Sequence, residues 1–273
     1  MSLFLCPICS SELTRGDKNY VCPKGHCYDI ASSGYVNLLP VNKKRSASPG
    51  DDKAMAAARK AFLDKGYYRP LRDALCETAV KVSPQNVTLL DAGCGEGYYT
   101  AGIYHALEAA GRDVQTAGID ISKDILKYAA KREKRIEYAV ASSFHLPIRD
   151  SSVDILLNCF SPLAEEEFRR VLKKGGYFIY VVPAAGHLWE MKSIAYDKPY
   201  QNEEKDIEYE GFKYADIIEV KSKLSLENQT DISNLFSMTP YFWRTPREGV
   251  QRLSQLEKLE TAAEFRIHIL KKL

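Results

Sequence analysis

The residues best suited to chemistry occupy a glycine-rich segment that directly follows a short apolar run at residues 87–90. Alternate glycines leave the backbone bare, so a ligand can approach it closely. A second apolar run, residues 116–119, ends at Asp120, where a carboxylate can accept both hydroxyl groups of a ribose. These features predict a nucleoside-containing ligand whose binding turn contains Gly93, Gly95 and Gly97.

Two acidic residues in this turn indicate which nucleoside. A dinucleotide site aims uncharged backbone amides at a pyrophosphate, whereas this turn contains Asp91 and Glu96. Carboxylates there would repel a pyrophosphate but attract a sulfonium and an ammonium group. We therefore predict S-adenosyl-L-methionine as the cofactor. The alternative is a strand-to-helix turn that binds no ligand.

Four potential metal ligands open the chain. Cys6 and Cys9 form one pair, and twelve residues separate Cys9 from Cys22, which begins a second short turn. This spacing is typical of a closed, structural zinc site that supplies folding energy to a segment with little core of its own. The spacing permits either His26 or Cys27 as the fourth ligand, and we favour His26. Unliganded thiols or a redox pair are the alternatives.

Apolar runs alternate with helix-length segments through the middle of the chain. This pattern predicts an α/β fold with a Rossmann-like doubly wound sheet, and two later runs predict antiparallel strands that complete seven strands. Helices are expected to begin near Gly97, Ser122 and Leu163, and a lysine–glycine segment at 173–176 to make a sharp entry to the fifth strand. The expected strands cover residues 87–90, 116–119, 136–141, 153–157, 177–182, 214–226 and 264–270.

Composition shifts divide the chain into three expected parts. Residues 1–40 form a zinc-binding module, residues 41–82 a basic linker followed by helices, and residues 83–273 the ligand-binding domain. In the linker region, Asp51 or Asp52 is expected to cap a helix that ends at Gly66. A second helix is expected from Pro70 to about Val82.

Charge is unevenly distributed although the whole chain carries only +2. Residues 1–72 hold 12 basic and 6 acidic side chains, so any attraction for a polyanion is concentrated there. No apolar run approaches the roughly 20 residues that a membrane span needs, and we expect a cytoplasmic protein that does not contact membrane. The basic residues either contact phosphates or form a solvated face; they are Lys43, Lys44, Arg45, Lys53, Arg59 and Lys60.

The Asp-x-Gly-x-Gly-x-Gly segment with Asp120 resembles the class I S-adenosylmethionine-dependent methyltransferases. The whole chain resembles a narrower group, the RlmA-type enzymes that methylate guanine N1 in a hairpin of 23S ribosomal RNA. The resemblance rests on the cysteine module, the Gly-Tyr-Val-Asn-Leu-Leu-Pro segment at 34–40, Pro-Gly-Asp at 49–51, Ala-Arg-Lys-Ala-Phe-Leu at 58–63 and Met-Thr-Pro at 238–240. It implies that the zinc module helps hold the RNA, and that Tyr68, Tyr98 and His187 contact the cofactor.

The sequence does not identify a catalytic base. Methylation of guanine N1 requires its proton to leave, and the candidates to accept it are His145, His187, Glu165 and Glu190. Each also has an ordinary interpretation as a helix cap or surface charge. Phe160, after the fourth strand, either stacks on the target base or fills core.

Two other functions fit parts of the pattern. One is a methyltransferase that acts on transfer RNA or a small molecule, with the zinc module only as a structural staple. The other is a non-catalytic zinc-containing RNA-binding assembly factor that keeps a cofactor fold, against which the complete glycine turn and Asp120 argue. A homodimer that forms a basic cleft is a further hypothesis.

Overall fold

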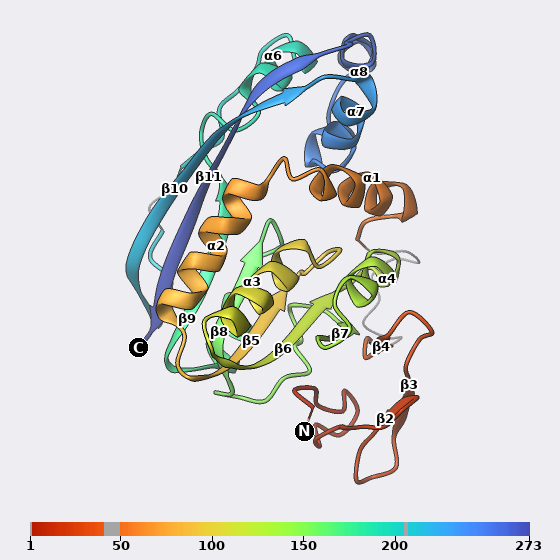
Figure 1. The fold of residues 1–273 in the computed structure, drawn as a ribbon, viewed down its shortest axis with the longest axis vertical. Helices are drawn as coiled ribbons and strands as arrows, with labels where there is room; N and C mark the ends of the chain where they lie inside the picture. Colours follow the sequence, from red (N-terminus) through yellow and green to blue (C-terminus); the bar gives the residue numbers. More distant parts are fainter. Residues whose placement is uncertain (1, 41–49, 205–206) are drawn as a thin grey trace.

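A computed structural model describes residues 2–40, 50–204 and 207–273 and contains one large mixed sheet (Figure 1). Its strand order is β10-β11-β9-β8-β5-β6-β7-β4. The strands from β9 to β4 are parallel, and β10 and β11 add an antiparallel pair at one edge. The strands are β4 (Tyr35–Asn37), β5 (Asn86–Ala92), β6 (Asp113–Asp120), β7 (Glu137–Val140), β8 (Val153–Cys159), β9 (Leu172–Pro183), β10 (Phe212–Leu226) and β11 (Leu259–Lys272).

The doubly wound sheet confirms the predicted fold class. Neighbouring residues of β5 show why it is buried on both sides, since Leu89 packs with helices α2 and α3 while Leu90 packs with α5 and the N-terminal segment. The lysine–glycine segment differs slightly from the prediction, because β9 already begins at Leu172. The pairing of β9 with β8 shifts register between Val153–Leu172 and Ile155–Tyr177. The two glycines therefore lie in an irregular part of β9, without paired residues on β8.

The first helix and α4 begin at the capping residues that the sequence predicted. The carboxylate of Asp52 accepts hydrogen bonds from two backbone amides of α1, and the hydroxyl of Ser122 caps α4. Among the described residues no helix is long and apolar enough to cross a membrane. The helices are α1 (Lys53–Asp64), α2 (Arg69–Val82), α3 (Tyr98–Ala109), α4 (Lys123–Arg132), α5 (Glu165–Val171), α6 (Trp189–Ala195), α7 (Gln229–Ser237), the 3₁₀ helix η2 (Pro240–Trp243) and α8 (Arg247–Ser254).

The sheet has eight strands, so the expectation of seven was wrong by one. The additional strand, β4, belongs to the N-terminal module and pairs in parallel with β7 at the sheet edge. The module itself contains a small antiparallel sheet of β1 (Thr14–Arg15), β2 (Asn19–Val21) and β3 (Cys27–Asp29). Figure 1 shows this module at the opposite end of the molecule from α6 and α8.

One buried carboxylate fastens the module to the domain. Glu137, the first residue of β7, accepts a hydrogen bond from the hydroxyl of Tyr20 at 2.9 Å and another from the backbone N–H of Leu3 at 3.1 Å. The side chains of Phe4 and Leu13 lie fully buried beside it in a core shared with the large sheet. The module is therefore packed onto the domain.

We expect Glu137→Ala to lower the free energy of unfolding by about 1–3 kcal/mol, because it leaves the buried Tyr20 hydroxyl and the partly buried Leu3 amide without an acceptor. Urea denaturation measures the change. Glu260→Ala is the matched control, because that carboxylate is exposed and pairs with Lys223 at the surface. Equal losses in both variants would contradict the anchoring role.

Candidate active site

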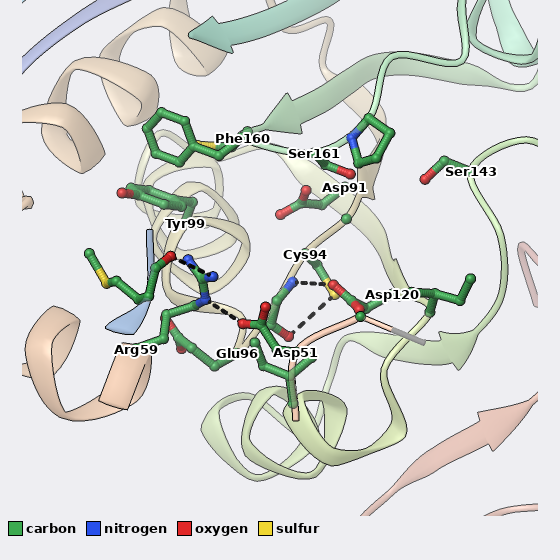
Figure 2. Close-up of a pocket in the computed structure, with 18 of the residues that line it drawn as sticks. Asp51, Arg59, Asp91, Cys94, Glu96, Tyr99, Asp120, Ser143, Phe160 and Ser161 are labelled. Carbon is green, nitrogen blue, oxygen red and sulfur yellow. Dashed lines mark hydrogen bonds and ion pairs between the residues drawn. The ribbon is translucent and has the colours of Figure 1, made fainter. Parts of the chain in front are cut away.

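A cavity of about 530 Å³ opens at the carboxyl ends of β5, β6 and β8, beneath α1 (Figure 2). This is the edge of an open α/β sheet where ligands bind. Figure 2 shows Tyr99, Phe160 and Arg59 on one side of the cavity and Asp120 on the other. The lining includes the predicted residues Tyr68, Asp91, Gly93, Gly95 and Asp120, and also Gly50, Asp51, Arg59, Glu96, Tyr99, Ser143, Phe160, Ser161 and Met238.

Two glycines of the turn are required by close contacts. Gly93 has φ +95°, and a Cβ atom there would lie 2.1 Å from the hydroxyl oxygen of Ser161. A Cβ atom at Gly97, which caps α3 with φ +81°, would lie 3.1 Å from Ala129 on α4. Gly93 therefore lets the loops after β5 and β8 meet at the cavity, while Gly97 packs one helix against another outside its lining.

Asp120 is oriented by backbone amides. Its Oδ2 atom accepts from the N–H of Gly95 at 3.0 Å and its Oδ1 atom from the N–H of Ser122 at 2.8 Å. Burial raises the pKa of this carboxyl to about 6, although both hydrogen bonds favour the ionised form. The carboxylate is thus fixed at the cavity wall and ionised at neutral pH, as an acceptor for ribose hydroxyls must be.

Asp91 is a buried carboxyl that lacks a partner on one oxygen. Its Oδ2 atom accepts from the hydroxyl of Thr100 at 2.5 Å, but among the described residues nothing hydrogen-bonds to Oδ1. Burial raises the pKa of Asp91 to about 7, and the nearby charges of Asp120 and Glu96 act in the same direction. A buried acceptor at a cavity wall fits a cationic ligand group, which would restore the ionised form.

Glu96 has a different role from Asp91. Its carboxylate is buried and pairs with the guanidinium of Arg132 at 2.7 Å. Burial raises the pKa of Glu96 to about 7, against the opposing effect of Arg132. The two acidic residues of the turn therefore differ, since Glu96 forms an ion pair with Arg132, whereas Asp91 forms none among the described residues.

Arg59 lines the cavity, a position that the sequence pattern did not indicate. Its Nε atom donates to Asp51 at 2.8 Å, and its Nη2 atom donates to the carbonyl of Met238 at 3.1 Å. The hypothesis of a phosphate-contacting surface is thus wrong for Arg59, because α1 turns it inward. Among the described lining residues it is the only lysine or arginine. The predicted basic residues Lys43, Lys44 and Arg45 lie outside the described residues.

The three aromatic residues implied by the resemblance lie in different places. Tyr68 lines the cavity, whereas the lining described here contains neither Tyr98 nor His187. The ring of Tyr98 packs against Arg72 and Arg132, and the following residue, Tyr99, reaches the cavity instead. Helical geometry explains this difference, since consecutive residues at the start of α3 point in different directions.

His187 lies one layer behind the cavity wall. Its ring centroid is 6.2 Å from that of Tyr68 and 4.7 Å from that of Phe265, and its Nδ1 atom accepts from the backbone N–H of Glu264 at 3.2 Å. Burial, together with the charge of Lys192, lowers the pKa of His187 to about 3. The imidazole is neutral, and direct contact with the cofactor stays a prediction.

The other candidate bases also lie outside the cavity lining. His145 is exposed, Glu165 accepts from the backbone N–H of Glu210, and Glu190 accepts from the hydroxyl of Thr261. The catalytic base therefore remains unassigned.

Phe160 lies at the cavity with 41% of its surface exposed, so its interpretation as a core residue was wrong. It adopts φ +55°, a strained conformation for a bulky residue. The side-chain amide of Asn158 donates to the carbonyls of Ala92 and Pro162 and holds the surrounding loop. The aromatic face is therefore available to a flat ligand.

The predicted zinc ligands converge in the N-terminal module. One ligand atom from each of Cys6, Cys9, Cys22 and His26 lies within 4.8 Å of all the others, and Cys27 is exposed outside this group. The Sγ atoms of Cys9 and Cys22 are 3.7 Å apart, and Nδ1 of His26 is 3.3 Å from the sulfur of Cys22. Three soft sulfurs and an imidazole at these separations fit tetrahedral zinc.

This fold and site define a class I S-adenosylmethionine-dependent methyltransferase with a zinc module. Residues 83–231 match the methyltransferase domain family and residues 4–47 match the RlmA N-terminal zinc-ribbon family. The chain belongs to the RlmA-type methyltransferase family.

Similar proteins cover the chain to different extents. YxjB of Bacillus subtilis (strain 168), which carries the provisional name 23S rRNA (guanine-N(1)-)-methyltransferase, is 31% identical over 98% of this chain and 96% of its own. The 23S rRNA (guanine(748)-N(1))-methyltransferase of Streptomyces fradiae is 36% identical over 68% of this chain and 65% of its own. The crystal structure of YcgJ from Bacillus subtilis is 17% identical, covers 73% of this chain and 98% of its own, and has a TM-score of 0.49.

We expect Cys22→Ala to abolish stoichiometric zinc binding and to lower the melting temperature, because the module would lose the ligation that stabilises it. Native mass spectrometry and thermal denaturation measure both effects. Cys27→Ala is the matched control and should retain one zinc ion. Loss of zinc in Cys27→Ala, with retention in His26→Ala, would show that the fourth ligand is Cys27.

Proposed function

We propose that this protein transfers a methyl group from S-adenosylmethionine to N1 of a guanine in a hairpin of 23S ribosomal RNA, in the cytoplasm. The proposal rests on a cavity that combines the exposed ring of Phe160 with a buried Asp91 oxygen to which no described residue hydrogen-bonds. The carboxyl suits the cationic cofactor, and the ring suits a purine. The names of the two relatives above supply the acceptor atom and the RNA.

The cavity residues divide the cofactor among them. Asp120 accepts the ribose hydroxyls, Asp91 accepts from the ammonium group, and Tyr68 packs beside them. The guanidinium of Arg59 faces the carboxylate of the methionine part, because a zwitterion needs a cation as well as anions. Gly93 and Gly95 permit close approach, Gly97 packs α3 against α4, and Tyr98 and His187 support the wall from behind.

The bound cofactor supplies an electrophilic methyl group, and the protein positions the acceptor. Phe160 stacks on the guanine, and Asn158 fixes the loop that carries this ring. The N1 proton must leave as the methyl group arrives, and no described side chain is assigned as its acceptor. Positioning of the acceptor is therefore the contribution that the described residues make to catalysis.

The zinc module gives the RNA a second contact. It is fastened to β7 by Glu137 and forms the edge of the same sheet that carries the cofactor site, so a hairpin held by it has a fixed position relative to the cavity. A homodimer with a basic cleft stays a hypothesis.

We expect Arg59→Gln to weaken binding of S-adenosylhomocysteine by about 10- to 100-fold, because a hydrogen bond between charged groups is lost. Binding of 5′-methylthioadenosine, which lacks the amino-acid part, should not change. Isothermal titration calorimetry measures both ligands, with Arg72→Gln as the control outside the cavity. Equal weakening of both ligands would instead show that Arg59 only holds the cavity together.

We expect the protein to transfer labelled methyl groups from S-adenosylmethionine to protein-free 23S ribosomal RNA. Nuclease digestion and mass spectrometry should identify 1-methylguanosine, and Asp120→Asn should lose most of the activity. Label on transfer RNA or on small molecules alone would reject the acceptor. RNA binding without any transfer would favour an assembly factor.

A further inference from the structure

The turn that follows α7 has an inner side fixed within the protein. Met238 lines the cavity, and its carbonyl oxygen accepts from Arg59. Tyr241 is buried, and its hydroxyl donates to the side chain of Asn202 at 3.3 Å, while the ammonium of Lys192 lies 5.5 Å from its ring centroid. These contacts give η2 a defined position beside the active site.

The outer side of the same turn exposes two large aromatic rings. Trp243 is 67% exposed and Phe242 is 37% exposed. Their ring centroids are 5.1 Å apart at an interplanar angle of 85°, and Phe242 also packs edge-on against Phe236 at 5.5 Å. An indole ring that is exposed to water does not gain the favourable free energy of burial. A partner that covers the ring would supply that free energy.

Two cationic side chains follow the rings closely in the sequence. Arg244 follows Trp243 directly, and Arg247 begins α8; both are exposed. In the described ranges neither guanidinium forms an ion pair with a carboxylate, although Glu248 is the next residue along α8. Exposed aromatic rings followed by arginines suit single-stranded RNA, whose bases stack on the rings while its phosphates contact the guanidiniums.

We propose that Phe242, Trp243, Arg244 and Arg247, here called the aromatic–arginine platform, bind an unpaired base of the RNA hairpin close to the base in the cavity. This inference rests on the proposed function and adds a contact distant from the zinc module (Figure 1). Trp243 is five residues from Met238, so their Cα atoms lie within roughly 17 Å of each other. One short RNA loop can therefore reach both the platform and the cavity.

The fluorescence of Trp243 can be used to detect binding of RNA at the platform. The sequence has two tryptophans, so Trp189→Phe leaves Trp243 as the only indole. We expect an RNA hairpin with an unpaired loop to quench this emission, in parallel with the fluorescence anisotropy of labelled RNA. Heparin, a polyanion without bases, should not quench it. The converse variant, Trp243→Phe, retains Trp189 and should show no RNA-dependent quenching.

Trp243→Ala should weaken binding of the hairpin about tenfold, as expected for one stacked base, and leave the affinity for S-adenosylhomocysteine unchanged. Ile217→Ala removes an exposed apolar side chain from β10 and is the control. RNA binding without a change in Trp243 emission, or no RNA binding at all, would overturn the platform. Quenching without methyl transfer would support the platform and reject the proposed function, whereas transfer with unchanged emission would do the reverse.

Discussion

The site depends on desolvated negative charge at the end of two adjacent parallel strands. The carboxyl groups of Asp91 and Asp120 are both buried and lie near each other. Burial raises the pKa of each well above its ordinary value. Ionising both without a ligand is unfavourable, because each charge has lost water and lies near the other. A ligand that carries ammonium and sulfonium groups reverses this cost. Part of the binding free energy therefore comes from neutralising two desolvated carboxylates that repel each other in the free protein.

The remaining elements hold these carboxyls in place and cover them. Backbone amides of Gly95 and Ser122 orient Asp120. Two bonds hold α1 over the cavity, since Arg59 donates to the carbonyl of Met238 and the hydroxyl of Ser122 donates to the carbonyl of Asp51. The carbonyl of Ala92 and the amide of Asn158 join the loops after β5 and β8. The N-terminal module adds β4 to the same sheet, so zinc ligation and the cofactor site share one rigid frame.

The sequence predicted the features that depend on local pattern. Apolar runs identified the parallel strands, capping residues identified the helix starts, and ligand spacing identified the zinc cluster, because each signal lies within a few residues. It did not predict β4, which is three residues long and becomes a strand only by pairing with β7. Nor could it show that Arg59 points inward or that Tyr99 rather than Tyr98 lines the cavity. Those outcomes depend on how α1 and α3 are rotated against elements distant in sequence.

The loop that carries Phe160 adopts a conformation that lowers the stability of the fold and leaves an aromatic ring exposed at the cavity. A phenylalanine at φ +55° costs of the order of 1–3 kcal/mol, and 41% of the residue's surface is also left exposed to water. Two hydrogen bonds from Asn158 and the tight packing of Ser161 on Gly93 enforce this conformation. A core role would not require such strain, since an aromatic residue can be buried without it. In the proposed function, this strained loop holds an aromatic face beside the cofactor site before the guanine arrives.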